Sequence, residues 1–171
     1  MANIRLVRID FRLIHGQVVN KWIKITQSNK IVVIDDTLAV NDFMKSVYVM
    51  AAPPGVEVQI YTVEDALTQW KENQFGAGNA LILFKGVKEA HNCYKGGFHF
   101  EHLQIGGLGA SPGRKIVFGP ITLDQNDADL LTDLNDTCGV RVYFHQVPDD
   151  PSAEFKKVMS KVKFEKGVDV E

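Results

Sequence analysis

The segment Arg8–Val19 reads RIDFRLIHGQVV and places His15 where an apolar strand pattern gives way to a helical one. An imidazole there is able to act as a metal ligand, a general base or a nucleophile, or to be only a polar turn residue. The helix expected from Gly16 begins with unpaired N–H groups and a positive dipole end, which together favour an anion beside His15. The same field disfavours a positively charged imidazole and leaves one ring nitrogen for nucleophilic attack.

Four further residues around His15 suit a phosphoryl group. Arg12 offers a planar fork of donors that matches phosphate or carboxylate oxygens. Gly16 and Gln17 supply backbone N–H groups of the first helical turn, and Asp10 is expected to orient the site. A second interpretation is a loop histidine beside an arginine that only pairs with Asp10, and the residue types alone leave both interpretations open.

The other histidines are weaker candidates. His91, His99 and His102 fall within twelve residues, but their spacing does not bring all three to one face of a helix. We therefore predict no metal site there and no cofactor. His145 ends the last expected strand, where we expect it to pack in the core or at the rim on the same side as His15.

Asp35, Asp36 and Lys85 raise the possibility of a receiver domain, in which Mg²⁺ helps to phosphorylate a central aspartate at a strand end. The third expected strand ends in IYTVED with no aspartate at its tip, and the acidic pair follows the second strand rather than the first. The receiver pattern therefore does not fit. Asp36 is expected instead to cap a helix that begins at Thr37.

A glycine-rich loop, GGLGASPGR, spans residues 106–114. It neither follows the first strand nor leads into a helix, and it lacks the Gly-Lys-Ser/Thr ending of a P-loop. We therefore expect no nucleotide at this loop, and we expect Arg114 to lie near the phosphate site or at a docking surface.

The composition is that of a single globular domain large enough for a core: 171 residues, 45% hydrophobic and 23% charged. A net charge of −2 without a long basic run gives no reason to expect nucleic-acid binding. Cys93 and Cys138 are expected to be buried free thiols. The chain shows no signal-peptide pattern and no apolar run near the ~18–20 residues that span a bilayer, so we expect a cytoplasmic protein. The domain is expected to cover residues 1–163, with a tail at 164–171.

Short apolar runs alternate with amphipathic segments along most of the chain. This alternation is typical of an α/β fold, here a single-domain, open, mainly parallel sheet of about seven strands with helices on both faces. The two strands expected around the glycine-rich loop have no helix between them, so they are either antiparallel or irregularly connected. The expected strands are 4–9, 30–34, 56–61, 80–84, 102–106, 115–119 and 140–144, and the expected helices are 16–25, 37–51, one from 62, 87–94, 123–137 and 152–163.

Several of these segments together resemble one family. The chain is similar to the IIB subunit of the mannose/fructose/sorbose/N-acetylgalactosamine family of sugar phosphotransferase systems (PTS). The segments that carry this resemblance are RIDFRLIHGQVV followed by Trp22, VVIDDTLAVNDF, GGLG with GRK, and GVRVYFHQVPDD. The resemblance covers about residues 3–163. Phe11 departs from the small polar or acidic residue that the family often has.

The resemblance implies a fold and an activity. The fold would be a mainly parallel sheet flanked by helices, and the chain would be a protein-N(pi)-phosphohistidine–sugar phosphotransferase. His15 would accept a phosphoryl group on Nδ1 from a phosphohistidine of the IIA subunit, and Arg12 would help to hold it. The group would then pass to a hexose or amino sugar, for instance N-acetylgalactosamine, that enters through the membrane subunits IIC and IID. The protein would then associate with the inner face of the membrane.

Two alternatives belong to other classes. In the first, the protein is a non-catalytic phosphate-binding or receiver-like regulatory module in which His15 only contacts a ligand. In the second it is a histidine phosphatase, but those enzymes normally have arginine directly before the histidine in an Arg-His-Gly triplet, where this chain has Ile14. Acid lability of the bound phosphate separates some of these classes, because phosphohistidine is lost in acid.

Overall fold

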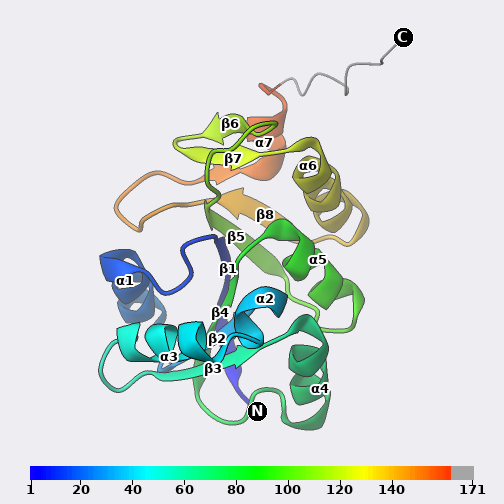
Figure 1. Ribbon diagram of the computed structural model, residues 1–171. Coiled ribbons are helices and arrows are strands. Elements are labelled where there is room, and N and C mark those ends of the chain that lie inside the picture. The colour runs from blue at the N-terminus through cyan, green and yellow to red at the C-terminus, as the bar shows by residue number, and fades with distance from the viewer. Residues whose placement is uncertain (163–171) are drawn as a thin grey trace.

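A seven-stranded sheet forms the centre of residues 1–162, the part of the chain that the computed structural model describes (Figure 1). Its strands are β1 (Asn3–Asp10), β2 (Lys30–Ile34), β3 (Glu57–Tyr61), β4 (Asn79–Phe84), β5 (His102–Gly107), β8 (Arg141–Phe144) and β9 (Ala153–Glu154). They lie in the order β3-β2-β4-β1-β5-β8-β9, and only β9 is antiparallel to its neighbour. The predicted open, mainly parallel sheet is confirmed. The tail expected at 164–171 lies outside the described residues.

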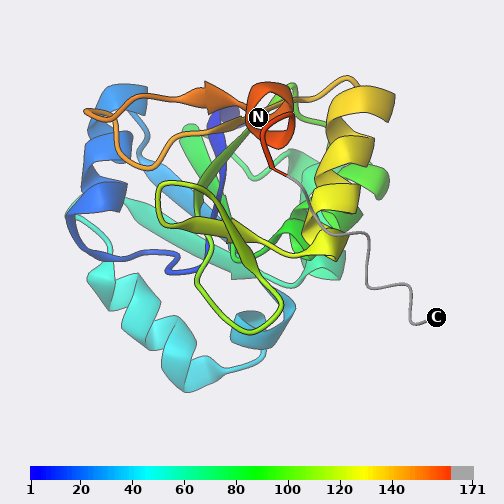
Figure 2. The ribbon, with the colours of Figure 1, turned by 90° about the horizontal axis from the view of Figure 1, so that it is seen from above.

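Helices cover both faces of the sheet, as predicted. They are α1 (Gly16–Thr26), α2 (Asp36–Ala39), α3 (Asp42–Ala51), α4 (Val63–Asn73), α5 (Val87–Lys95), α6 (Gln125–Thr132) and α7 (Phe155–Met159), and the π-helical segment η1 (Asp133–Thr137) continues α6. In Figure 1, α1 and α3 lie on one side of the sheet and α4, α5 and α6 on the other, and Figure 2 shows α1 and α6 on opposite sides from above. Helix α1 begins at Gly16, six residues after the carboxyl end of β1, and β1 is the central strand of the sheet.

The apolar run of β2 shows why the sheet is buried on both sides. Ile31 and Val33 join a core cluster that contains Trp22 of α1, whereas Val32 and Ile34 join the cluster under the helices of the opposite face. Alternate side chains of a strand point to opposite faces, so an unbroken apolar run is needed when helices cover both. Each of these four side chains is fully buried, and such burial contributes about 1.5–3 kcal/mol per side chain.

The helix predicted over 37–51 is divided into α2 and α3. Asn41 interrupts it, because its side-chain oxygen accepts a hydrogen bond from the Met44 N–H at 3.0 Å and so begins a new helix. The predicted cap is also corrected. Asp35, not Asp36, caps α2, since its carboxylate accepts from Leu38 N–H at 2.9 Å, while Asp36 accepts from Val63 N–H at 2.8 Å.

The strand predicted at 115–119 lies outside the main sheet. It forms β6 (Lys115–Phe118), which pairs antiparallel with β7 (Ile121–Leu123) in a separate hairpin. The helix predicted over 123–137 therefore starts only at Gln125, after β7. The last helix is shorter than predicted, because 153 and 154 form β9 at the edge of the sheet.

The two cysteines are free thiols within the described part of the chain. Cys93 is buried as predicted, and burial raises the pKa of its thiol to about 12. Cys138 is only half-buried.

Candidate functional site

The β1–α1 loop presents His15 to solvent. His15 is exposed and is the residue immediately before α1, with an extended backbone. Leu13 and Gly16 both have φ of +56°, and these two left-handed residues turn the chain from strand to helix. Leu13 and Ile14 are buried at 1% and 5% exposure in the core cluster of α1. Apolar anchors thus fix the loop while the imidazole stays accessible.

The first turn of α1 is left open to an anion. No side chain of the cap residue bonds to it, and the turn contains no acidic residue. By contrast, Asp35, Asn41, Thr62 and Asp124 each accept a hydrogen bond from the first turn of their own helix. The N–H groups of a helix start need an acceptor, and the positive end of the helix dipole favours a negative one. This terminus, unlike those four, lacks a side-chain acceptor of its own.

Arg12 is paired with Asp10, as the second interpretation of the sequence proposed. Arg12 Nε donates to Asp10 Oδ1 at 3.0 Å and Nη2 donates to Oδ2 at 3.0 Å. The Arg12 backbone N–H also donates to Oδ1, at 3.1 Å. The hydrogen bonds from Arg12 to Asp10 raise the pKa of the guanidinium above its ordinary value. Nη1 has no hydrogen-bond partner among residues 1–162, so Asp10 holds Arg12 while leaving this edge of the fork for another acceptor.

The sequence reasoning missed Arg8, which is fully buried beneath this pair. Its Nη2 donates to Asp10 Oδ2 at 3.1 Å, so Asp10 lies between two arginines. Burial lowers the pKa of the Arg8 guanidinium from its ordinary value. The signal was available, because residues two apart on a strand share a face, and Arg8 stands two residues before Asp10.

A hollow of about 370 Å³ adjoins Arg12. The Phe11 side chain forms part of its wall, is 41% exposed, and has its ring centroid 5.8 Å from Arg12 Cζ. Gly109 packs so closely against the Phe11 ring that an added Cβ would lie 3.1 Å from it. Phe11 therefore shapes the surface beside Arg12. The hollow is lined by Phe11, Arg12, Gly107, Leu108, Gly109, Ala110, Pro120, Ile121 and Gln146.

His145 lies at the rim of the sheet. Its ring packs edge-on against Trp22 of α1 with centroids 4.9 Å apart, and Nε2 lies 2.9 Å from the carbonyl oxygen of Asp150. Trp22 Nε1 in turn donates to the carbonyl of Gln146 at 3.2 Å. His145 therefore connects α1 to the loop after β8, which agrees with the rim packing expected from the sequence.

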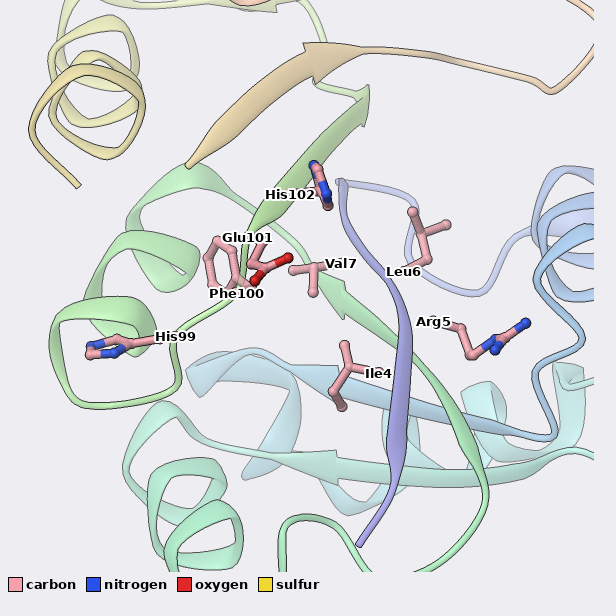
Figure 3. A pocket seen from close by; sticks show the side chains of 8 residues that line it. All are labelled: Ile4, Arg5, Leu6, Val7, His99, Phe100, Glu101 and His102. Carbon is pink, nitrogen blue, oxygen red and sulfur yellow. The ribbon is translucent and has the colours of Figure 1, made fainter. Parts of the chain in front are cut away.

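The remaining histidines do not form one cluster. His91 Nε2 lies 2.7 Å from Asp133 Oδ2, whereas His99 packs its ring against Tyr94 at 4.6 Å. His99 and His102 line a hollow of about 260 Å³ beside the first half of β1, which Figure 3 shows. Within residues 1–162, no group of three or more His, Cys, Asp and Glu side chains is arranged to hold a metal ion.

Arg114 closes the glycine-rich loop. Its Nη2 donates to Asp127 at 2.6 Å, its Nη1 to Asp124 at 3.2 Å, and its Nε to the Thr122 hydroxyl at 3.0 Å. The same hydroxyl donates to the carbonyl of Gly109 at 2.7 Å. Arg114 and Thr122 thus tie the loop to β7 and to the start of α6.

The fold and site together define an α/β domain that presents a histidine at the carboxyl end of its central strand. A family model for the sorbose subfamily IIB component of the PTS matches residues 4–169. The chain therefore belongs to this family of phosphotransferase-system components, as the sequence resemblance predicted.

Individual relatives agree with this assignment. The sorbose-specific EIIB component of Lacticaseibacillus casei is 31% identical over 88% of this chain and 92% of its own length. The crystal structure of manxB from Thermoanaerobacter tengcongensis is 37% identical and superposes with a TM-score of 0.88 over 94% of this chain and 97% of its own. The mannose-specific EIIAB component of Escherichia coli strain K12 is 28% identical over 93% of this chain. This chain spans about half (49%) of that protein.

Among the described helices, none combines the length and the apolar character needed to cross a membrane.

Proposed function

We propose that this protein is a phosphoryl carrier and sugar phosphotransferase subunit in which His15 is the phosphorylated residue. The observation that carries the proposal is the arrangement of an exposed imidazole directly before an uncapped helix N-terminus, with Arg12 held three residues away by Asp10. Gly16 and Gln17 supply N–H groups at that terminus. Membership of the IIB family supports the same activity.

The proposed reaction has two transfers. His15 Nδ1 attacks the phosphorus of a phosphohistidine on IIA, and the bond from phosphorus to the donor nitrogen breaks as the new one forms. A hydroxyl of the sugar then attacks the phosphorus as the bond from phosphorus to His15 Nδ1 breaks, and the hydroxyl proton is balanced by protonation of the leaving His15 imidazole. The sugar is the one translocated by the membrane subunits IIC and IID, which would hold the protein at the inner face of the membrane.

The charges around His15 suit a carrier. Phosphoryl transfer depends mainly on positioning and on electrostatic stabilisation of the transferred group. A site with many cations would retain the phosphate, whereas a carrier must release it. Arg12 forms an ion pair with Asp10 through Nε and Nη2, and its Nη1 is left to bind the phosphate. Arg12 and one helix N-terminus therefore hold the group without trapping it.

The shape of the site supports transfer between proteins. His15 is exposed, and Arg12, three residues before it, lines an open hollow. A second histidine side chain can approach a surface imidazole, but it could not enter a deep pocket. The Phe11 ring at the wall of the hollow would contact the partner protein.

The relatives do not select one sugar. Proteins that are 26–31% identical to this chain carry names for mannose, sorbose, fructose and N-acetylgalactosamine. The phosphate donor contacts His15, but the sugar would be held largely by the membrane subunits. Any hexose or amino sugar is therefore a candidate, and N-acetylgalactosamine is included among those to test.

Reconstitution tests the proposal. The protein is combined with its cognate IIA and with vesicles that contain IIC and IID, and phosphorylation of a panel of sugars is measured. We expect one sugar or a small group to be phosphorylated by the wild type and none by His15→Ala. His91→Ala is the matched control and should keep activity, because its ring pairs with Asp133 between α5 and η1, on the opposite side of the sheet from α1. Equal activity of His15→Ala and wild type would refute the proposal.

A further inference from the structure

Arg8 is fully buried, and it contacts α1, β5 and the loop that follows β8. It lies on β1, its guanidinium carbon is 5.4 Å from the ring centroid of Trp22 on α1, and it donates to Gln104 on β5. Its Nη1 and Nη2 also donate to the backbone carbonyls of His145 and Gln146, at 2.9 and 2.8 Å. A buried charge is costly in free energy unless it is paired and hydrogen-bonded. The burial of Arg8 therefore calls for an explanation in terms of structure or function.

The space for Arg8 comes from Gly106 on β5. A Cβ atom added to Gly106 would overlap the guanidinium of Arg8. The neighbouring Gly107 plays the same part for the other two residues, since its added Cβ would lie 2.9 Å from Asp10 Oδ1 and 3.2 Å from Arg12 Nη2. The glycine pair at the end of β5 therefore makes room for the whole row of Arg8, Asp10 and Arg12.

The charges of this row have a consequence for the site. Asp10 is buried and accepts hydrogen bonds from both arginines, one of which is buried and one of which is partly exposed. With Asp10 and Arg12 alone, the carboxylate would cancel the charge of the arginine that faces solvent. With Arg8 present, the buried arginine balances the carboxylate and Arg12 keeps its positive charge for a bound anion. Interactions of buried charges are only weakly screened by solvent and salt.

We propose that Arg8 is a positioning residue for phosphoryl transfer: it balances Asp10 from below, so that the same carboxylate holds Arg12 in place without neutralising it. This inference rests on the proposed function of His15. Arg8 does not touch the phosphoryl group, and its effect passes through Asp10 to Arg12. Gly106 belongs to the same device, because any larger residue displaces Arg8.

A double-mutant cycle separates this role from a general loss of structure. The rate of transfer from phosphorylated IIA is measured for wild type, Arg8→Met, Arg12→Ala and the double variant. We expect Arg8→Met to slow transfer about ten- to a hundredfold. In the Arg12→Ala background the same change should cost less than about threefold, because residues that act through one another are not additive. Arg8→Lys restores the charge without the full set of hydrogen bonds and should give an intermediate rate.

Arg5→Met is the matched control. Arg5 lies on the same strand but is exposed, and its Nε donates to the carbonyl of Thr26, the last residue of α1, at 2.9 Å, at the opposite end of that helix from His15. This variant should transfer phosphate at the wild-type rate. Gly106→Ala perturbs Arg8 without changing a charged residue and should slow transfer in the same way as Arg8→Met.

Two outcomes overturn the inference. One is a folded Arg8→Met protein with wild-type transfer, and the other is an equal loss in the Arg12-containing and Arg12→Ala backgrounds. If Arg8→Met does not fold, the same cycle is measured with Arg8→Lys and Gly106→Ala, and their folding is checked by thermal unfolding. If none of the three variants folds, Arg8 serves folding and the inference is overturned as well. Failure of the proposed function is distinct, because the wild type itself would then take no phosphate on His15.

Discussion

At the scale of single residues, Asp10 determines the geometry of the site. Its buried carboxylate accepts from the Arg12 backbone N–H, from Arg12 Nε and Nη2, and from Arg8 Nη2. Hydrogen bonds to charged groups are stronger and more directional than neutral ones. Arg12 therefore cannot swing freely in solvent, although its side chain is 25% exposed. The pairing that looked from sequence like an alternative to phosphate binding is, in our account, what prepares Arg12 for it.

Arg12→Lys should slow phosphoryl transfer while the protein stays folded. Lysine keeps the charge but loses the two-pronged contact with Asp10 and the remaining edge of the guanidinium. A lost hydrogen bond to a charged group costs roughly 1.5–3 kcal/mol, and each 1.36 kcal/mol is about tenfold in rate. We therefore expect a decrease of about ten- to a hundredfold, measured by rapid quench with phosphorylated IIA.

Arg141→Lys provides the comparison for this variant. Arg141 forms an exposed pair with Glu154 at 2.7 Å on the edge of the sheet, and its replacement should leave transfer unchanged. Unchanged transfer in both directions for Arg12→Lys would show that Arg12 serves only structure.

At the scale of elements, much of the site was readable from the sequence and part of it was not. The apolar runs predicted β2 and β4, and the motif around His15 predicted where β1 ends and α1 begins. The left-handed conformation of Leu13 was not readable, because leucine rarely adopts positive φ. Its side chain is buried in the cluster of α1, and its N–H donates to the Asp10 carbonyl at 2.9 Å. The spacing of Arg8 and Asp10 predicts a shared face, but the burial of Arg8 was not readable, because the glycine that makes room for it, Gly106, comes from a strand distant in sequence.

The packing of α5 against η1 gives a prediction for pH. Hydrogen bonds from His91 and Lys95 of α5 lower the pKa of the Asp133 carboxyl from its ordinary value. A carboxyl whose pKa is lower in the folded protein stabilises the fold when the pH is above its pKa in the unfolded chain, about 3.9. This stabilisation is lost as the pH falls through the folded-state pKa. Asp133→Asn should therefore lower the urea midpoint near pH 7, and its difference from wild type should shrink as the pH falls below about 3.9, the ordinary value for aspartate.

Asp136→Asn on the same segment is the control for Asp133. Asp136 Oδ1 lies 3.6 Å from Nζ of the exposed Lys156, so its loss should change the urea midpoint less. A deficit of Asp133→Asn that stays constant across the pH range would mean that packing, and not the ionised carboxylate, connects α5 to η1.

At the scale of the whole molecule, the sheet gathers polar groups at the carboxyl ends of its parallel strands, as the fold class predicts. The acidic residues at that edge have structural partners. Asp35 caps α2, Asp36 accepts from Val63 N–H at the start of α4, and Asp10 is shared by two arginines. The separate β6–β7 hairpin was not foreseen, although Gly119 and Pro120 between two short apolar runs are a typical turn signal.

Phosphoryl transfer to this protein should need no metal ion. In metal-dependent transfer Mg²⁺ offsets the charge of linked nucleotide phosphates, whereas between two histidines a single phosphoryl group moves. Arg12 and the start of α1 would meet its charge. Phosphorylated IIA and this protein should therefore exchange phosphate equally fast with EDTA and with Mg²⁺. A reaction stopped by EDTA and restored by Mg²⁺ would favour the receiver-like alternative, and Asp35 and Asp36 would be mutated next.

The central claim is that His15 alone carries the phosphoryl group, and mapping of the modified residue tests it most directly. The protein is incubated with phosphorylated IIA, digested under alkaline conditions that preserve phosphohistidine, and analysed by mass spectrometry, with His15→Ala in parallel. We predict phosphate on His15 in the wild type and none on any residue of His15→Ala. Phosphate on His91, His99, His102 or His145 in the His15→Ala protein would contradict the account.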